Sequence, residues 1–132
     1  MAAPELTLVH RDEVLLVEDN DDIRFLLRFW LDEDERCGQV WEAATCADAV
    51  HVASSQEVDA MVVDFMLEGG TIAECLPALR AERPDARIVV YTANMQVARE
   101  AGVLALGADL LVEKMTVVVE DVVDLVLADQ SA

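Results

Sequence analysis

The chain has 132 residues, 55% apolar and 27% charged, which is typical of one globular domain with one hydrophobic core and excludes a disordered chain. Nine basic and 27 acidic side chains give a net charge of −18, which disfavours nucleic acid and anionic membranes and favours a protein partner or a cation. Because the chain opens without a basic segment leading into an apolar one, and its apolar runs are short, we expect a cytoplasmic protein.

Short apolar runs alternate with helical patterns along the chain. After a polar lead-in at residues 1–12, we expect one domain over residues 13–128 and a tail at 129–132. Strands are predicted at residues 14–17, 40–44, 60–64, 87–91 and 109–112, and helices at 21–31, 45–53, 71–82, 98–106 and 116–127. Pro77 predicts that the third helix is kinked or starts later than Thr71. Strand and helix alternate five times, which indicates an α/β fold with a parallel sheet covered on both faces.

The three cysteines are Cys37, Cys46 and Cys75. They form no CxxC pair and cannot all pair with one another. We therefore interpret them as core-filling residues in a reducing cytosol and not as ligands.

Polar side chains follow the predicted strands at the point where each strand ends. Glu18 and Asp19 follow the first strand, Asp64 ends the third, Thr92 follows the fourth, and Lys114 follows the fifth. In a parallel sheet these residues share one edge, where two carboxylates about 4 Å apart repel by roughly 4 kcal/mol. A hard divalent cation relieves that repulsion. A metal, a hydroxyl and an ammonium beside one carboxylate suit phosphoryl transfer, with Asp64 as the nucleophile.

In this order and spacing, the motifs VLLVEDN, MVVDFML, VVYTA and GADLLVEKM resemble those of the receiver domain of bacterial two-component response regulators. The resemblance extends from about residue 13 to residue 127. It implies a stand-alone, chemotaxis-regulator-like domain: a doubly wound, flavodoxin-like sheet of five parallel strands in the order 2-1-3-4-5, flanked by five helices. The implied partner is a sensor histidine kinase or a histidine phosphotransfer protein.

The resemblance also implies roles at the metal site. Asp64 would accept a phosphoryl group from a phosphohistidine. Asp19, Asp64 and the Met66 backbone carbonyl would bind Mg²⁺ or Mn²⁺ directly, and Glu18 would bind it through water. The domain would be a phosphoacceptor and not a turnover enzyme.

Thr92 and Lys114 would hold phosphoryl oxygens, and Thr92 would move on phosphorylation to alter an interaction surface. Asn94 lies where the family modulates loss of the phosphoryl group. Several positions depart from the family pattern, and two of them bear on the output. Leu111 replaces the usual switch aromatic, and Met115 replaces the usual proline. The acceptor chemistry is thus expected to be retained with an atypical output.

The last helix carries two apolar stripes. Val118, Val122, Leu125 and Val126 are predicted to face the core, which leaves a second stripe formed by Val119, Val123 and Leu127. An exposed apolar stripe predicts a partner interface or a homodimer. A wholly buried helix is an equal alternative.

Proteins of three other classes share this predicted fold or its aspartate at a strand end, and only the first of them stays open. A degenerate receiver would act as a dimerisation or interaction module without phosphorylation. A haloacid dehalogenase-type phosphatase would need a second aspartate at the position of Met66. A flavodoxin-like nucleotide binder would need a glycine-rich phosphate loop after the first strand, which the sequence lacks.

Overall fold

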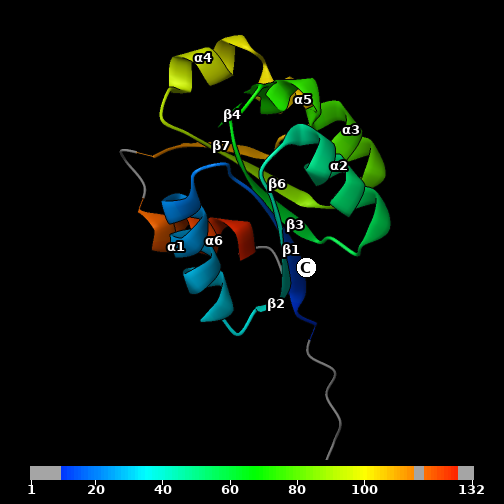
Figure 1. Ribbon diagram of the computed structural model, residues 1–132, viewed down its shortest axis with the longest axis vertical. Helices are drawn as coiled ribbons and strands as arrows, with labels where there is room; N and C mark the ends of the chain where they lie inside the picture. Colours follow the sequence, from blue (N-terminus) through cyan, green and yellow to red (C-terminus); the bar gives the residue numbers. More distant parts are fainter. Residues whose placement is uncertain (1–9, 115–117, 128–132) are drawn as a thin grey trace, which may run out of the picture.

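The computed structural model of the protein describes residues 10–114 and 118–127 (Figure 1). Its main sheet has five parallel strands in the order β2-β1-β3-β6-β7. These strands are β1 (Asp12–Val17), β2 (Cys37–Ala43), β3 (Ala60–Asp64), β6 (Arg87–Thr92) and β7 (Leu110–Glu113). Numbered among themselves along the chain they give 2-1-3-4-5, so the predicted fold class and strand order are confirmed.

Helices cover both faces of the sheet. One face packs against α1 (Asp21–Asp32) and α6 (Val119–Leu127). The other face packs against α2 (Cys46–Ser55), α3 (Leu76–Glu82), α4 (Met95–Glu100) and α5 (Val103–Leu106), as Figure 1 shows. Alternate side chains of β1 explain the two cores, because Val14 and Leu16 enter one while Leu15 and Val17 enter the other. None of the helices in the described ranges has the length and apolar character that a membrane span requires.

The segment after β3 differs from the single helix expected at residues 71–82. A small antiparallel hairpin forms from β4 (Met66–Leu67) and β5 (Gly70–Thr71), and a 3₁₀ turn, η1 (Ile72–Glu74), follows it. Gly69 adopts a positive φ of 87° in the hairpin turn, a conformation that favours glycine. Helix α3 then begins at Leu76, so Pro77 lies in the first turn, where a missing N–H is tolerated. Of the two alternatives, a kinked helix or a start later than Thr71, the later start is confirmed.

The predicted helix at residues 98–106 is divided in two. Asn94 caps α4 by accepting a hydrogen bond from the Val97 amide at 3.2 Å, so this helix begins earlier than predicted. Gly102 then takes a left-handed φ of 72° and separates α4 from α5.

Two of the three cysteines are bonded to each other, which the interpretation of core-filling residues in a reducing cytosol did not anticipate, although Cys75 is buried in the core and Cys46 packs against it. Cys46 and Cys75 form a disulfide between the start of α2 and the junction of η1 with α3. Cys37 is free and buried, as expected of a core-filling residue.

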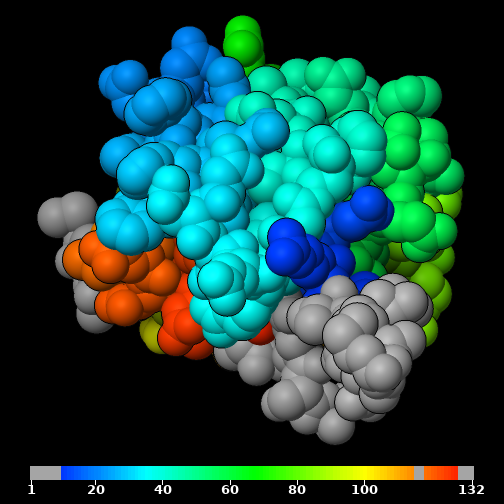
Figure 2. Space-filling model, turned by 90° about the horizontal axis from the view of Figure 1, so that it is seen from below, coloured from blue at the N-terminus to red at the C-terminus, as the bar shows by residue number. Residues whose placement is uncertain are grey.

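The predicted register of the last helix is partly wrong, because Val122 and Val126 face the core as predicted but the second apolar stripe is not exposed. The alternative of a buried helix is closer to the structure. Val123 and Leu127 are buried against the sheet while Val118 is 62% exposed, because α6 turns its apolar side toward β3 and β6 and lies along α1 (Figure 2). The outer side of α6 is acidic instead, with Glu120, Asp121 and Asp124 exposed. An exposed stripe of Val119, Val123 and Leu127 does not exist, which removes the basis for a homodimer through these residues.

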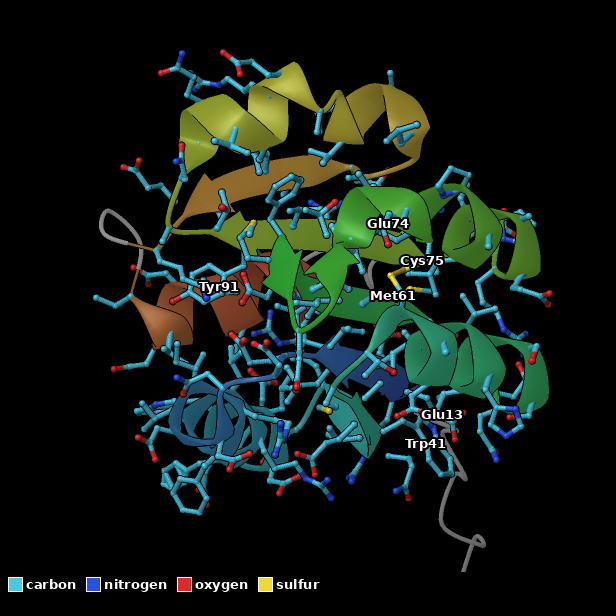
Figure 3. All side chains as sticks on the ribbon, turned by 45° about the horizontal axis from the view of Figure 1, so that its top comes forward. Glu13, Trp41, Met61, Glu74, Cys75 and Tyr91 are labelled. Atoms are coloured by element: carbon cyan, nitrogen blue, oxygen red, sulfur yellow. A yellow bond between two sulfur atoms is a disulfide. The ribbon has the colours of Figure 1, made fainter. Side chains whose placement is uncertain are left out.

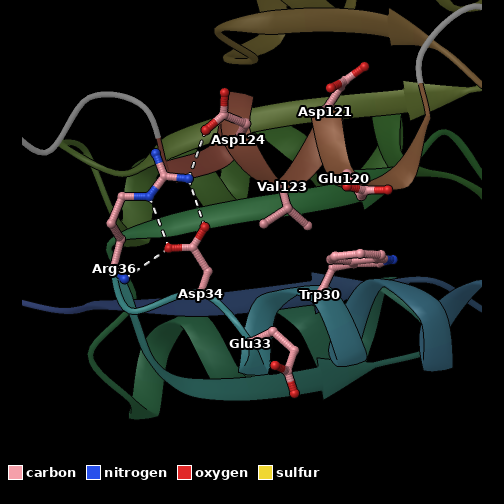
Figure 4. A pocket seen from close by; sticks show the side chains of 8 residues that line it. All are labelled: Trp30, Glu33, Asp34, Arg36, Glu120, Asp121, Val123 and Asp124. Atoms are coloured by element: carbon pink, nitrogen blue, oxygen red, sulfur yellow. Dashed lines mark hydrogen bonds and ion pairs between the residues drawn. The ribbon is translucent and has the colours of Figure 1, made fainter.

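Val123 faces a hollow between the two helices. This pocket of about 360 Å³ has Trp30 on its α1 side and Val123 on its α6 side (Figure 4). Arg36 closes one end through ion pairs with Asp34 at 2.7 Å and Asp124 at 2.8 Å. None of the residues predicted for the phosphoryl and metal site lines it.

Candidate functional site

The candidate site lies at the edge of the sheet where the parallel strands end. Glu18 follows β1 directly, Asp64 is the last residue of β3, Thr92 is the last residue of β6, and Lys114 follows β7. The strands are neighbours in register, with Val17 beside Val63 and Thr92 beside Glu113. The fold therefore brings residues up to 96 positions apart to one edge.

Three carboxylates form the centre of the site. Glu18, Asp19 and Asp64 each offer an oxygen atom, and these atoms lie within 4.8 Å of one another. Glu18 is 1% exposed and Asp64 is 8% exposed. A concentration of negative charge in so little water is unfavourable unless cations or protons compensate for it.

Lys114 supplies one compensating charge. Its ammonium nitrogen lies 3.2 Å from Asp64 Oδ2 and 3.3 Å from Glu18 Oε1. The backbone positions it, because the Lys114 amide donates to the Thr92 carbonyl at 2.8 Å and continues the pairing of β6 with β7. The pKa of the Lys114 ammonium lies above its usual value, since burial lowers it but the charges of Asp64 and Glu18 raise it by more.

Among the three carboxylates, Glu18 is the one whose pKa is shifted far from its usual value. Burial, followed by a hydrogen bond to Asp64 and the charge of Asp64, raises the pKa of the Glu18 carboxyl from 4.5 to about 7. Lys114 and the Asn20 amide, which donates to Glu18 Oε2 at 3.3 Å, oppose that rise. The site thus accommodates its third carboxylate poorly without a further cation.

The first turn of α1 holds the loop that carries Glu18 and Asp19. Asn20 caps the helix by accepting a hydrogen bond from the Ile23 amide at 3.0 Å. Arg24 donates from Nη1 to the Glu18 carbonyl at 2.8 Å. The acidic residues that open α1, Asp21 and Asp22, are exposed and complement the helix dipole.

Thr92 lies at the site, but its hydroxyl is engaged elsewhere. The side chain is 1% exposed, and its Oγ1 accepts from the Asn94 amide at 3.0 Å and donates to the Asn94 carbonyl at 3.3 Å. Within the described residues, no hydrogen bond joins this hydroxyl to Asp64 or Lys114. Thr92 and Asn94, predicted separately, therefore form one unit at the start of α4.

Three further residues were predicted to act at or near the site, namely Met66, Leu111 and Met115. The Met66 side chain is 55% exposed on the hairpin that follows Asp64. Leu111 is half-buried on β7 and packs toward the core under α2 to α5. Met115 lies outside the described residues.

Tyr91 contacts Lys114 at the site and was not predicted from the sequence. Its ring lies beneath Lys114, with the ammonium nitrogen 5.1 Å from the ring centroid, and Figure 3 shows it at the ends of the strands. Burial is the main cause of a raised pKa of the Tyr91 hydroxyl. Its position directly before Thr92, on the strand that pairs with β3 beside Asp64, could have indicated from the sequence that it lies near the site.

Comparison with known proteins agrees with this arrangement. The sequence matches the family described as response regulator receiver domain over residues 14–126. The photosynthetic apparatus regulatory protein RegA of Rhodovulum sulfidophilum is 33% identical over 108 residues, which cover 82% of this chain and 58% of RegA. The acid tolerance regulatory protein ActR of Rhizobium meliloti is 29% identical over 106 residues, 80% of this chain and 54% of ActR. The chain thus spans little more than half the length of these relatives.

Solved structures establish the same fold. A CheY-like receiver domain protein from Methanospirillum hungatei aligns with a TM-score of 0.80 at 20% identity, covering 91% of this chain and 96% of that one. A response regulator from Burkholderia pseudomallei, solved with a phosphorylated aspartic acid and a calcium ion, aligns with a TM-score of 0.77 at 24% identity over 87% of this chain and 66% of that one. The family match covers most of the sequence, and the chain belongs to the response regulator receiver domain family.

Proposed function

We propose that this receiver accepts a phosphoryl group on Asp64 from the phosphohistidine of a sensor histidine kinase or a histidine phosphotransfer protein. The observation that carries the proposal is the cluster of Glu18, Asp19 and Asp64 with Lys114 in contact with two of the three. The domain is then a phosphoacceptor and not a turnover enzyme, and it works in the cytoplasm where such donors are found.

The donor set fits a divalent cation, with Mg²⁺ or Mn²⁺ as the expected ion. Carboxylate oxygens are the ligands that these hard cations prefer, and three of them lie within 4.8 Å of one another at this edge of the sheet. Asp19, Asp64 and the Met66 carbonyl would hold the ion directly, and Glu18 through water. When bound, the ion would neutralise charge on the phosphoryl oxygens.

The residues of the chain divide the chemistry among them. A carboxylate oxygen of Asp64 attacks phosphorus as the P–N bond to the donor imidazole breaks, and the leaving imidazole takes up a proton. Lys114, 3.2 Å from Asp64, is in place to hold a phosphoryl oxygen. The Thr92 hydroxyl would exchange its hydrogen bonds with Asn94 for one to a phosphoryl oxygen.

That exchange offers a route from chemistry to output. Release of the Asn94 backbone would disturb the cap of α4, since the same residue accepts the hydrogen bond from Val97. Leu111, on the strand beside β6, would then repack in place of the usual aromatic. The readout would be a changed protein interaction surface, and the acidic chain would not itself contact nucleic acid.

Intact mass spectrometry after incubation with acetyl phosphate tests the proposal. We expect the chain to gain one phosphoryl mass, with Mg²⁺ required and no gain in Asp64→Asn. The matched control is Asp59→Asn, which changes the aspartate directly before β3, at the opposite edge of the sheet. This variant should still gain the phosphoryl mass. A folded wild-type chain that does not label beside an active receiver would support the degenerate, phosphorylation-independent module instead.

A further inference from the structure

The disulfide encloses the segment that carries the acceptor. Cys46 is the first residue of α2 and Cys75 lies 29 positions later, with 5.7 Å between their Cα atoms, a usual separation for bonded cysteines. The chain between them includes β3, Asp64 and the β4–β5 hairpin. Figure 3 shows Cys75 and the sulfur bridge beside α2.

The bridge ties the hairpin side of Asp64 to α2. Phe65, directly after Asp64, accepts a hydrogen bond at its carbonyl from the Ile72 amide at 2.8 Å. Ile72 opens the 3₁₀ turn that ends at Cys75. The position of Met66, between Phe65 and the hairpin turn, therefore depends on a short loop whose far end is fixed by Cys75.

The two cysteines differ in exposure and in surroundings. Cys75 is 6% exposed, whereas Cys46 is half-buried and lines a pocket of about 160 Å³ together with the hairpin turn at Gly69 and Gly70. Because Cys46 lines this pocket and Cys75 does not, we expect a small thiol that enters it to react at Cys46. The Cys46 sulfur also lies 3.6 Å from the Thr71 carbonyl oxygen, to which a reduced thiol would donate a weak hydrogen bond.

The third cysteine is an internal reference. Cys37 lies on β2 and is buried away from this pocket. Burial, with the nearby charge of Asp32 next, raises the pKa of its thiol to about 11, so little thiolate is present at neutral pH. Cys37 is therefore expected to be inert under conditions that cycle an accessible pair.

We propose that Cys46 and Cys75 form a reversible redox pair that exchanges with a small cellular thiol such as glutathione, and that its state tunes phosphoryl acceptance at Asp64. The second half of this proposal rests on the proposed function. Disulfides in the cytosol are typically transient or redox-sensing, which agrees with a pair next to an opening and does not require a purely structural bond.

The exchange balances as two displacements. A glutathione thiolate attacks Cys46 Sγ, the bond between the two protein sulfurs breaks, and Cys75 leaves as a thiolate that takes up a proton. A second glutathione thiolate attacks the glutathione sulfur of the mixed disulfide. The bond between that sulfur and Cys46 Sγ breaks, and Cys46 leaves as a thiolate that is then protonated. Two glutathiones are oxidised to one disulfide and the protein pair gains two electrons. Oxidation by glutathione disulfide is the reverse.

The first arm of the test measures the pair alone. The full chain is equilibrated in glutathione buffers from reducing to oxidising, alkylated under denaturing conditions so that buried thiols also react, and analysed by intact mass spectrometry. We expect two alkyl groups to disappear together as the buffer becomes oxidising, in the wild type and in Cys37→Ser. A pair that stays reduced in every buffer, or that stays bridged in a folded protein even in excess thiol, would overturn the redox assignment.

The second arm measures coupling. The reduced and oxidised forms are labelled with acetyl phosphate and Mg²⁺, and their Mg²⁺ affinities are determined by calorimetry. We expect the bridged form to label several-fold faster, because its loop is held beside Asp64, and the variant Cys46→Ser/Cys75→Ser to be indifferent to the buffer. Equal rates and equal affinities would overturn the coupling.

The two failures are distinguishable. If neither form takes up a phosphoryl group, the proposed function fails. The alkylation result still decides whether the cysteines are a redox pair. The Mg²⁺ affinities of the two forms still decide whether that pair is coupled to the carboxylate cluster.

Discussion

Binding of Mg²⁺ should release a proton from Glu18 at mildly acidic pH. The Glu18 carboxyl has a pKa of about 7 in the free protein, and a cation at the cluster requires its ionised form. A group with that pKa is about 90% protonated at pH 6 and about 10% protonated at pH 8. Because protons and metal compete, the apparent Mg²⁺ affinity should rise roughly tenfold between these two pH values.

Calorimetry in two buffers of different ionisation enthalpy counts the protons directly. We expect close to one proton released per Mg²⁺ at pH 6, almost none at pH 8, and a flat pH profile for Glu18→Gln. Asp22→Asn, which removes an exposed carboxylate of α1, should retain the wild-type profile and controls for net charge. A wild-type affinity that does not change between pH 6 and pH 8 would refute the argument that Glu18 is protonated in the free site.

The same shift has a consequence for stability without metal. A carboxyl whose pKa is raised on folding stabilises the folded state below its unfolded value of 4.5, and that stability is lost as the pH rises through about 7. Glu18→Gln should therefore be more stable than the wild type at pH 8. The shift from 4.5 to about 7 corresponds to about 3 kcal/mol, which is the order of the expected difference between the two proteins.

Three further predictions concern the site and the fold. Lys114→Ala should slow labelling by acetyl phosphate about 100-fold, because a preorganised cation is lost. An unchanged rate, measured by mass spectrometry of samples quenched at successive times, would show that Lys114 takes no part in phosphoryl transfer. Pro77→Ala should alter the free energy of unfolding by less than about 1 kcal/mol, whereas Leu79→Ala, at a fully buried site in the same helix, should cost about 2 to 5 kcal/mol in urea titrations. Val123→Glu should destabilise the fold by several kcal/mol while Val118→Glu has little effect, and equal melting temperatures for the two variants would contradict the observed register of α6.

The sequence predicted the sheet because buried parallel strands read as short apolar runs. Residues 60–64 are all buried, and the motif there contains one carboxylate at its end. Since strand ends of a parallel sheet converge, the positions of Glu18, Asp64 and Lys114 followed without knowledge of their distances. What could not follow was the strength of their coupling, which depends on burial and on separations of a few ångströms.

The wrong predictions share a cause in long-range packing. In α6 every apolar residue fits more than one helical register, and contact with α1 and the sheet selects the register that buries Val123. The pairing of Cys46 with Cys75 needed the loop after Asp64 to fold back as a hairpin, which two glycines alone do not specify. Tyr91 was overlooked because its contact with Lys114 joins two strands that are adjacent only in the sheet.

The role of Asp64 as the phosphoryl acceptor is tested most directly by finding the residue that carries the phosphoryl group. The chain is labelled with acetyl phosphate and Mg²⁺, reduced with borohydride, which converts an acyl phosphate to an alcohol, digested, and sequenced by tandem mass spectrometry. We expect conversion of Asp64 to homoserine, and of no other residue, in the Mg²⁺ sample only. Conversion at Asp19 or Glu18 with Asp64 intact would contradict it.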